Sequence, residues 1–289
     1  MSRRELARHE RFEQVSPEVG VLDEEALADA MRDDPDAALA LLADLAGATD
    51  RELRELARRL AGQVFIDLAP RGDGRARGVG RMRTVPLGDD PGRGDLDLDA
   101  SLDALLAGGG GAVEPAALRV KAWVRPTTAL CLMVDRSGSM GGRALATAAL
   151  AAAAVAMQAP TDYSVLAFGK DVVVPKGQGA VQAPDGVVHD LLALRGFGTT
   201  DLAAAMAEAT RQLARSRAGR KVAVLLSDCR STTGGDPVAA ARGLDELVVI
   251  APERDDEEAR VFAARVGARC YTVSGPAEIG LVLTNAISR

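Results

Sequence analysis

The chain has 289 residues, room for one large or two modest domains, and its 47% hydrophobic content allows a substantial core. A net charge of −6 and only 3% aromatic residues argue against a nucleic-acid surface. The charged N-terminus has no signal-peptide core, and no segment reaches the roughly 20 apolar residues of a membrane span, so we expect a cytoplasmic protein that does not enter the membrane. The three cysteines lack paired spacing and are expected to be free thiols. The Arg-, Ala- and Gly-rich composition indicates bacterial coding bias.

Residues 1–69 form the first predicted segment, an N-terminal helical region. Asp23 is a plausible N-cap, a second apolar stripe follows Asp34, and Thr49 with Glu52 matches a capping box. These helices could pack against the main domain or bind a partner protein, and the sequence does not decide between the two roles. Residues 70–94 then become rich in Arg, Gly, Asp and Pro, which predicts a linker. Its Arg-Gly-Asp triplets at residues 71 and 93 are coincidences to be expected in such a composition.

Residues 95–127 are expected to form a lead-in helix and an edge strand. Residues 95–106 begin with alternation and become helical, and a run of four glycines follows. Residues 118–125 alternate strictly between apolar and polar positions, as a half-exposed edge strand does.

Residues 128–289 alternate between strand-like and helix-like segments. This order predicts an α/β fold, a doubly wound and mostly parallel sheet with helices on both faces. Residues 163–174 are expected to form a hairpin at the sheet edge. The expected strands are 128–134, 163–169, 172–174, 221–228, 247–251 and 270–273. The expected helices are 144–157, 184–194, 201–216, 255–266 and 276–287.

A candidate ligand loop follows the first of these strands. Asp135, Ser137 and Ser139 alternate along a tight loop at the carboxyl end of a buried strand, where open α/β sheets place their ligand sites. One carboxylate and two hydroxyls can converge on one centre, and such hard oxygen donors suit Mg²⁺. Asp, Ser and Gly also form ordinary turns, so this motif alone leaves a plain loop possible.

Two later loops extend the pattern. Thr200 precedes the predicted helix at 201–216, and Asp228 ends a buried strand. Together with the first loop this set resembles the metal-ion-dependent adhesion site (MIDAS) of von Willebrand factor type A (VWA) domains. The resemblance implies that the metal is held by a set of hydroxyl and carboxylate groups from Asp135, Ser137, Ser139, Thr200 and Asp228.

Three further residues are expected beside this site. Gly138 lies within the first loop, and Asp201 is placed to cap the following helix. The position of Cys229 is usually glycine in VWA domains, and we expect this side chain either to narrow access to the metal or, more simply, to tuck into the core.

The segment before the metal loop resembles CoxE-like VWA proteins, which are encoded alongside MoxR-type AAA+ ATPases. The resemblance implies a non-enzymatic adaptor to such an ATPase in protein maturation or metal-cofactor insertion. A partner's Asp or Glu would complete the shell of Mg²⁺ (Mn²⁺ or Ca²⁺ are possible), and the helix at 276–287 would move. The rim would comprise the loops around Gly141, Phe197 and Arg230.

Motifs of several enzyme classes are absent from the sequence. It contains no G-x-x-x-x-G-K-[ST] phosphate loop and no G-x-S-x-G nucleophile elbow, and no histidine is placed in the pattern to activate Ser137 or Ser139. We therefore expect no enzymatic activity. Two alternatives stay open, a Mg²⁺-dependent hydrolase of phosphate esters and a structural scaffold with an empty site.

Overall fold

The structure is a computed structural model that describes residues 1–70, 81–87, 94–107, 113–124, 127–136, 142–194 and 198–288. The chain divides into two compact units. The first combines Met1–Gly74 with Thr128–Arg289, and the second is Arg75–Thr127. The four segment boundaries expected from the sequence stay predictions. Among the described residues, no helix combines the length and the apolar character needed to cross a bilayer.

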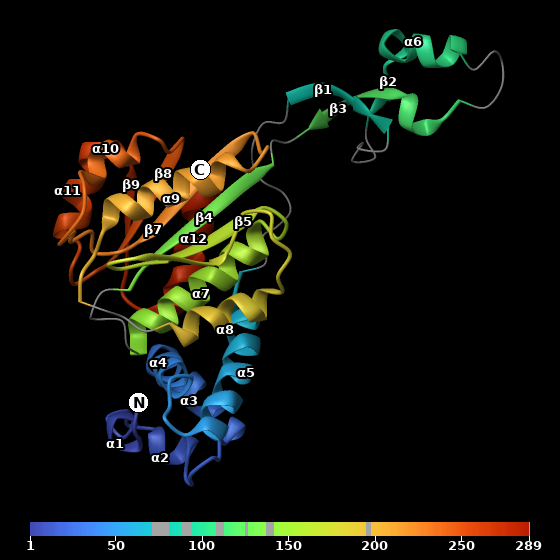
Figure 1. The fold of residues 1–289 in the computed structure, drawn as a ribbon. Helices are drawn as coiled ribbons and strands as arrows, with labels where there is room; N and C mark the ends of the chain where they lie inside the picture. Colours follow the sequence, from blue (N-terminus) through green and yellow to red (C-terminus); the bar gives the residue numbers. More distant parts are fainter. Residues whose placement is uncertain are drawn as a thin grey trace. The chain divides into compact units, whose positions relative to one another are not determined.

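A six-stranded sheet, counted over the described residues, forms the centre of the first unit (Figure 1). The strand order is β6-β5-β4-β7-β8-β9, and every neighbouring pair is parallel except the edge pair β5–β6. This confirms the predicted fold class and the edge hairpin. The strands are β4 (Thr128–Asp135), β5 (Tyr163–Phe168), β6 (Val172–Lys176), β7 (Arg220–Leu226), β8 (Glu246–Pro252) and β9 (Arg269–Val273).

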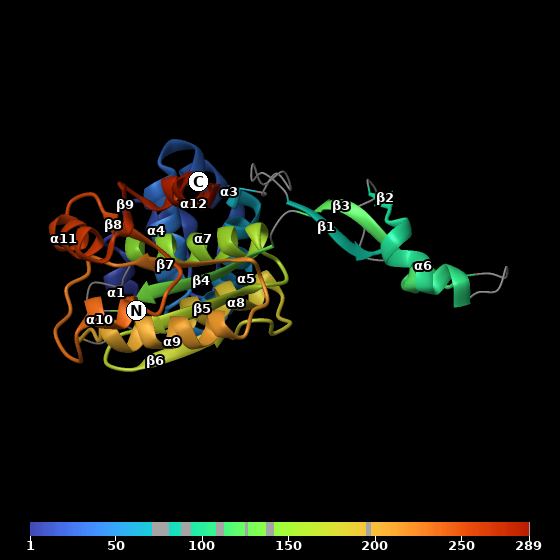
Figure 2. The same cartoon turned by 90° about the horizontal axis from the view of Figure 1, so that it is seen from above.

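Helices cover both faces of this sheet (Figure 2). Alternate residues of β4 show the division: Leu132 and Val134 belong to one core cluster, whereas Cys131 and Met133 belong to the other. The first face is covered by α7 (Gly142–Gln158), α8 (Pro184–Ala193) and α12 (Ile279–Ser288), which follows the 3₁₀ turn η3 (Pro276–Glu278). The second face is covered by α9 (Leu202–Ala214), α10 (Pro237–Ala241) and α11 (Glu257–Val266).

The N-terminal helices pack on the helices of the first face. The elements are α1 (Arg3–Leu6), α2 (Phe12–Val15), α3 (Glu24–Asp33), α4 (Pro35–Leu45) and α5 (Arg51–Leu68). Helix α4 lies against α7, and α5 lies against α8, so these helices share the core of the sheet unit. The expected capping box at Thr49 is wrong. Asp50 is the N-cap of α5 and accepts from the backbone N–H of Glu52, whereas the Thr49 hydroxyl donates to the Met1 carbonyl.

The second unit has its own small sheet, with strand order β1-β3-β2. Its elements are β1 (Arg81–Pro86), β2 (Asp95–Leu96), α6 (Leu98–Ala107), η2 (Pro115–Ala117) and β3 (Arg119–Val124). The predicted alternation of buried and exposed positions in β3 is confirmed, because Val120 and Ala122 are buried while Arg119 and Lys121 are exposed. The expected edge position is nevertheless wrong, because β3 pairs on both sides, and β1 forms inside the expected linker.

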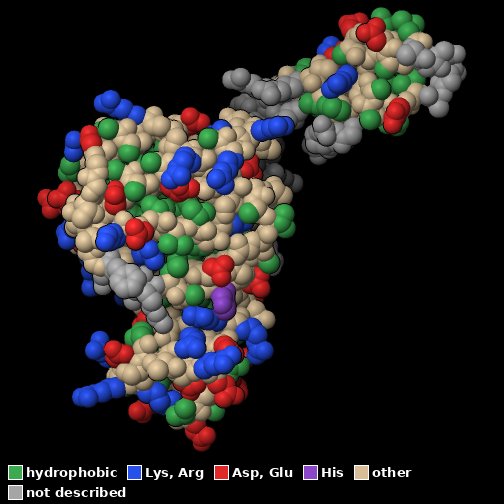
Figure 3. Space-filling view, viewed as in Figure 1, with side chains coloured by type: hydrophobic (Ala, Val, Ile, Leu, Met, Phe, Trp, Pro, Cys, Tyr) green, Lys and Arg blue, Asp and Glu red, His purple; other side chains and the backbone are tan. Residues whose placement is uncertain are grey.

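Charged side chains of both signs intermingle on the described surface in view in Figure 3. The Arg-Gly-Asp triplet at residues 71–73 lies outside the described residues, as does Arg93 of the second triplet.

Candidate metal centre

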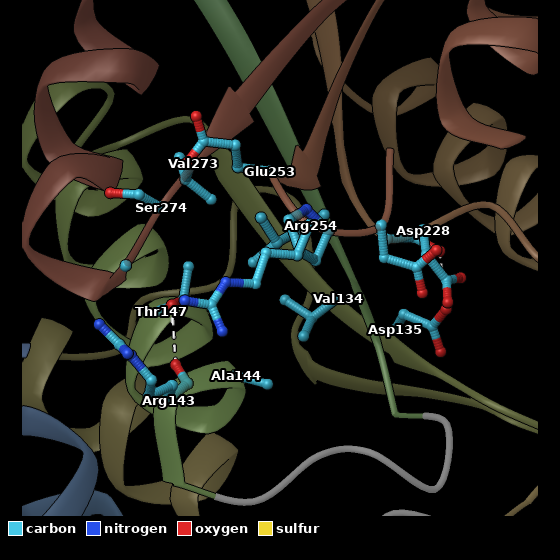
Figure 4. A pocket seen from close by; sticks show the side chains of 15 residues that line it. Val134, Asp135, Arg143, Ala144, Thr147, Asp228, Glu253, Arg254, Val273 and Ser274 are labelled. Atoms are coloured by element: carbon cyan, nitrogen blue, oxygen red, sulfur yellow. Dashed lines mark hydrogen bonds between the residues drawn. The ribbon is translucent and has the colours of Figure 1, made fainter. Parts of the chain in front are cut away.

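Two neighbouring parallel strands bring the candidate aspartates together. Asp135 is the last residue of β4 and is buried, with 6% of its surface exposed, and Asp228 follows the end of β7. The Ser227 hydroxyl donates to Asp135 Oδ2 over 2.7 Å and accepts from the backbone N–H of Cys229 over 2.9 Å. Figure 4 shows the carboxylates of Asp135 and Asp228 close to one another. Ser227 therefore ties the carboxylate of one strand to the loop that follows the other.

Thr200 is held by the loop that follows Asp228. It is 2% exposed, and its backbone N–H donates to Thr232 Oγ1 over 2.8 Å. Its carbonyl accepts from the backbone N–H groups of Thr232 and Thr233, at 3.0 and 3.2 Å. Asp201 caps α9 as expected, accepting from the Ala204 N–H over 2.9 Å.

The first candidate loop lies largely outside the described residues. Ser137, Gly138 and Ser139, and the rim residues Gly141 and Phe197, are all outside them, and their predicted roles stay predictions. The described chain resumes at Gly142, whose backbone N–H donates to Asp44 Oδ1 over 2.8 Å. The N-terminal helix α4 therefore holds the residue that begins α7, immediately after this loop.

Cys229 adopts a backbone conformation that glycine favours. Its φ of 63° lies in the left-handed region, where an L side chain is strained. The side chain is buried in the cluster between the sheet and the helices of the second face, as expected. Burial raises the pKa of this thiol well above its ordinary value, and the negative charge of Asp228 raises it further. Cys229 therefore carries a protonated thiol beside the site, which is a poor metal ligand and a poor nucleophile.

The donor set fits a hard divalent cation. The described residues contain no cluster of three or more His, Cys, Asp or Glu side chains, so a metal here depends on two carboxylates supplemented by hydroxyls. Carboxylate and hydroxyl oxygens suit Mg²⁺, Mn²⁺ or Ca²⁺, whereas zinc sites favour thiolate and imidazole.

Two residues that organise this region were not among the predicted site residues. Ser227 had a usable signal, because it is a polar residue between a buried apolar strand and the predicted ligand Asp228. Thr232 had none, because its contact with Thr200 joins loops 32 positions apart.

A doubly wound sheet with two aspartates at the carboxyl ends of neighbouring strands, and a threonine just before a helix on one of its faces, is the arrangement of the VWA class. The sequence profile of the family described as "VWA domain containing CoxE-like protein" matches residues 75–254, more than half of the chain. The chain therefore belongs to this family of VWA proteins.

Solved structures with a similar fold include proximal thread matrix protein 1 of the mussel byssus, at 13% identity and a TM-score of 0.48, with 56% of this chain and 47% of that chain covered. They also include a von Willebrand factor type A protein from Catenulispora acidiphila, at 19% identity and a TM-score of 0.45, with 59% and 43% covered. BatB from Bacteroides thetaiotaomicron has 13% identity and a TM-score of 0.43, with 56% and 96% covered. The match spans less than half the length of the first two. No curated protein matches this sequence significantly.

Proposed function

We propose that this protein binds a carboxylate of a protein partner through a divalent cation, Mg²⁺ by preference. VWA domains are generally interaction domains without enzymatic activity, and membership of the family supports a role in protein interaction. The observation that carries the proposal is the convergence of Asp135 and Asp228 at the ends of β4 and β7, where Ser227, next to Asp228 in the chain, donates to the Asp135 carboxylate.

The residues proposed to hold the cation are Asp135, Ser137, Ser139, Thr200 and Asp228. A bound cation supplies an open coordination position that an incoming Asp or Glu can fill. The neighbouring residues prepare that position. Ser227 orients the Asp135 carboxylate, and the loop around Thr232 holds Thr200 at the start of α9.

The proposed partner is a MoxR-type AAA+ ATPase, to which this protein would act as an adaptor in protein maturation or metal-cofactor insertion. The family match supports this reading, because it is the CoxE-like family. A binding assay with a candidate ATPase in Mg²⁺ and in EDTA tests it. We expect binding that needs Mg²⁺ and is lost in Asp135→Ala.

Thermal unfolding in EDTA, Mg²⁺, Mn²⁺ and Ca²⁺ tests the metal site directly. A ligand that binds only the folded state at a hundredfold excess over its Kd stabilises it by about 2.7 kcal/mol. We expect a Mg²⁺-dependent rise in Tm for the wild type and for Asp67→Ala, an exposed control on α5, and no rise for Asp135→Ala. An equal rise in Asp135→Ala would place the metal elsewhere, and no rise in the wild type would contradict metal binding by the free protein.

A Mg²⁺-dependent hydrolase of phosphate esters is the second candidate. Two arginines, Arg143 and Arg254, line a pocket next to the aspartates and could contact a phosphate. Incubation with p-nitrophenyl phosphate and Mg²⁺ separates the candidates. Turnover that disappears in Asp135→Ala would favour the hydrolase, and we expect none.

A further inference from the structure

A pocket of about 600 Å³ lies next to the two aspartates, at the carboxyl ends of β4, β7, β8 and β9. The apolar side chains of Val134, Leu226 and Val273 also line it. Val134 lies between the aspartates and the guanidinium of Arg254 (Figure 4), and Leu226 is its register partner on β7. Asp135 and Asp228 lie at one end, and the side chains of Arg143 and Arg254 lie toward the other (Figure 4). This volume can hold a few side chains of a bound peptide.

Arg254 is a positively charged side chain of this pocket that can pair with a ligand. It follows β8 by two residues, is exposed, and makes no hydrogen bond or ion pair with any described residue. Its side chain extends across the pocket toward Thr147 and Arg143 (Figure 4). Arg143 differs, because its guanidinium donates to Asp36 Oδ2 over 2.9 Å. A guanidinium offers five N–H donors in a planar fork that matches a carboxylate.

The charges of the lining residues favour an anion once a cation is bound. Asp135 and Asp228 then face the cation, which offsets their two negative charges. Asp255, which also lines the pocket, already pairs with Arg230. Glu253 remains, and its carboxylate points away from the guanidinium of Arg254 (Figure 4). A ligand that reaches the metal with one negative group can therefore place a second negative group at the end of the pocket where Arg254 lies.

We propose that this pocket binds an acidic segment of the partner protein that carries two carboxylates flanking an apolar side chain. The first carboxylate reaches the metal, the apolar side chain lies over Val134 and Leu226, and the second carboxylate pairs with Arg254. This inference rests on the proposed function and adds Arg254 as a specificity-determining residue. The selection of two acids separated by an apolar residue follows from the order of charges and apolar surface along the pocket.

The test is a double-mutant cycle on the full chain in saturating Mg²⁺. The probes are fluorescein-labelled peptides that contain Asp-Leu-Asp or Asp-Leu-Leu-Asp, each with a counterpart in which the second Asp is Asn. We expect the wild type to bind the better diacid about 5- to 10-fold more tightly than its counterpart, the gain of one exposed charge-assisted pair. Arg254→Gln should remove this preference while binding the Asn counterpart as the wild type does.

Two further variants control for charge. Arg265→Gln, an exposed arginine in the last turn of α11, changes the net charge equally and should keep the full preference. Arg254→Lys should keep part of it, because the charge remains while the planar fork is lost.

The outcomes separate this inference from the function on which it rests. No Mg²⁺-induced rise in Tm, together with peptide binding that is equal in Mg²⁺ and in EDTA, would overturn the proposed function. A normal rise, together with a diacid preference that is missing in the wild type or survives in Arg254→Gln, would overturn only the role of Arg254. Free glutarate that binds as tightly as the best peptide would show a pocket for small dicarboxylates and would overturn the partner segment.

Discussion

Individual hydrogen bonds at Ser227 and Thr232 connect residues from distant parts of the chain at the proposed metal site. Ser227 uses its hydroxyl twice, as a donor to Asp135 and as an acceptor from the Cys229 N–H. Thr232 in turn accepts from the Thr200 N–H. The loop at residues 227–233 therefore holds Asp135 and Thr200, two of the proposed ligands. Its conformation includes the strained backbone of Cys229.

Substitutions of Cys229 should reveal this strain. Glycine relieves a left-handed conformation that costs about 1–2 kcal/mol, but it also loses about 1 kcal/mol of buried side chain. We therefore expect the free energy of unfolding of Cys229→Gly, measured in urea, to lie within about 1 kcal/mol of the wild-type value. Cys229→Val should lose about 2 kcal/mol or more, because a β-branched residue is poorly tolerated at a φ of 63°. Cys131→Val, in the extended backbone of β4, is the control and should lose less than about 1.5 kcal/mol.

The thiol of Cys131 should make stability fall at alkaline pH. Burial raises its pKa from 9.0 to about 12 in the folded protein. Between these values the unfolded chain releases a proton that the folded chain keeps. The contribution of this thiol to the free energy of unfolding is therefore complete below pH 9 and is lost as pH rises toward 12. We expect about 1–2 kcal/mol of this loss by pH 10.5. Urea unfolding at pH 8 and pH 10.5 should show a larger loss in the wild type than in Cys131→Val, and equal losses would contradict the assignment.

At the scale of elements, α4 holds two helices of the sheet unit through two carboxylates. Asp44 accepts from Gly142, the first residue of α7, over 2.8 Å, and its other oxygen lies 2.8 Å from His9 Nε2. Asp36 accepts from the backbone N–H of Ala277, in the turn before α12, over 2.8 Å. The first residue of α7, which follows the candidate metal loop, and the turn before the last helix are thus both attached to the N-terminal region.

Loss of the Asp44 carboxylate should destabilise the whole unit. Asp44 is 8% exposed, so Asp44→Ala leaves the Gly142 N–H without its acceptor in a buried place. Such a loss costs about 1–3 kcal/mol, and we expect the free energy of unfolding of Asp44→Ala, measured in urea, to be lower by that amount. Asp33→Ala removes an exposed ion pair with Arg11 and should cost about 1 kcal/mol at most. Equal stabilities of the two variants would show that the Asp44 contact contributes little.

At the scale of the whole molecule, α7 is enclosed from both sides. Its residues from Leu145 to Ala156 are all buried, which a helix lying on one sheet with its outer face in water could not achieve. The sheet covers one side, and the N-terminal helices α4 and α5 contact the other. The N-terminal helices are therefore part of the structural core of this unit.

Removal of residues 1–69 should expose this apolar face of α7. We expect the truncated chain to aggregate in size-exclusion chromatography or to bind the dye ANS strongly, because large exposed apolar surfaces associate. The full chain measured in parallel is the control. A truncated chain that is monodisperse, does not bind ANS and unfolds cooperatively would show that the N-terminal helices are dispensable for folding.

The amino-acid sequence by itself determined the fold class and the places of Asp135, Asp201 and Asp228 at the ends of elements. These features are local, because an apolar run predicts a buried strand and a polar residue at its end marks a loop. Only the tertiary structure decided that β3 is central in its sheet, that α4 covers α7, that Ser227 bridges to Asp135, and that Arg254 faces the pocket. Each of these depends on contacts between residues far apart in the chain, and a local pattern of hydrophobicity carries no record of which partner a strand, helix or side chain will meet.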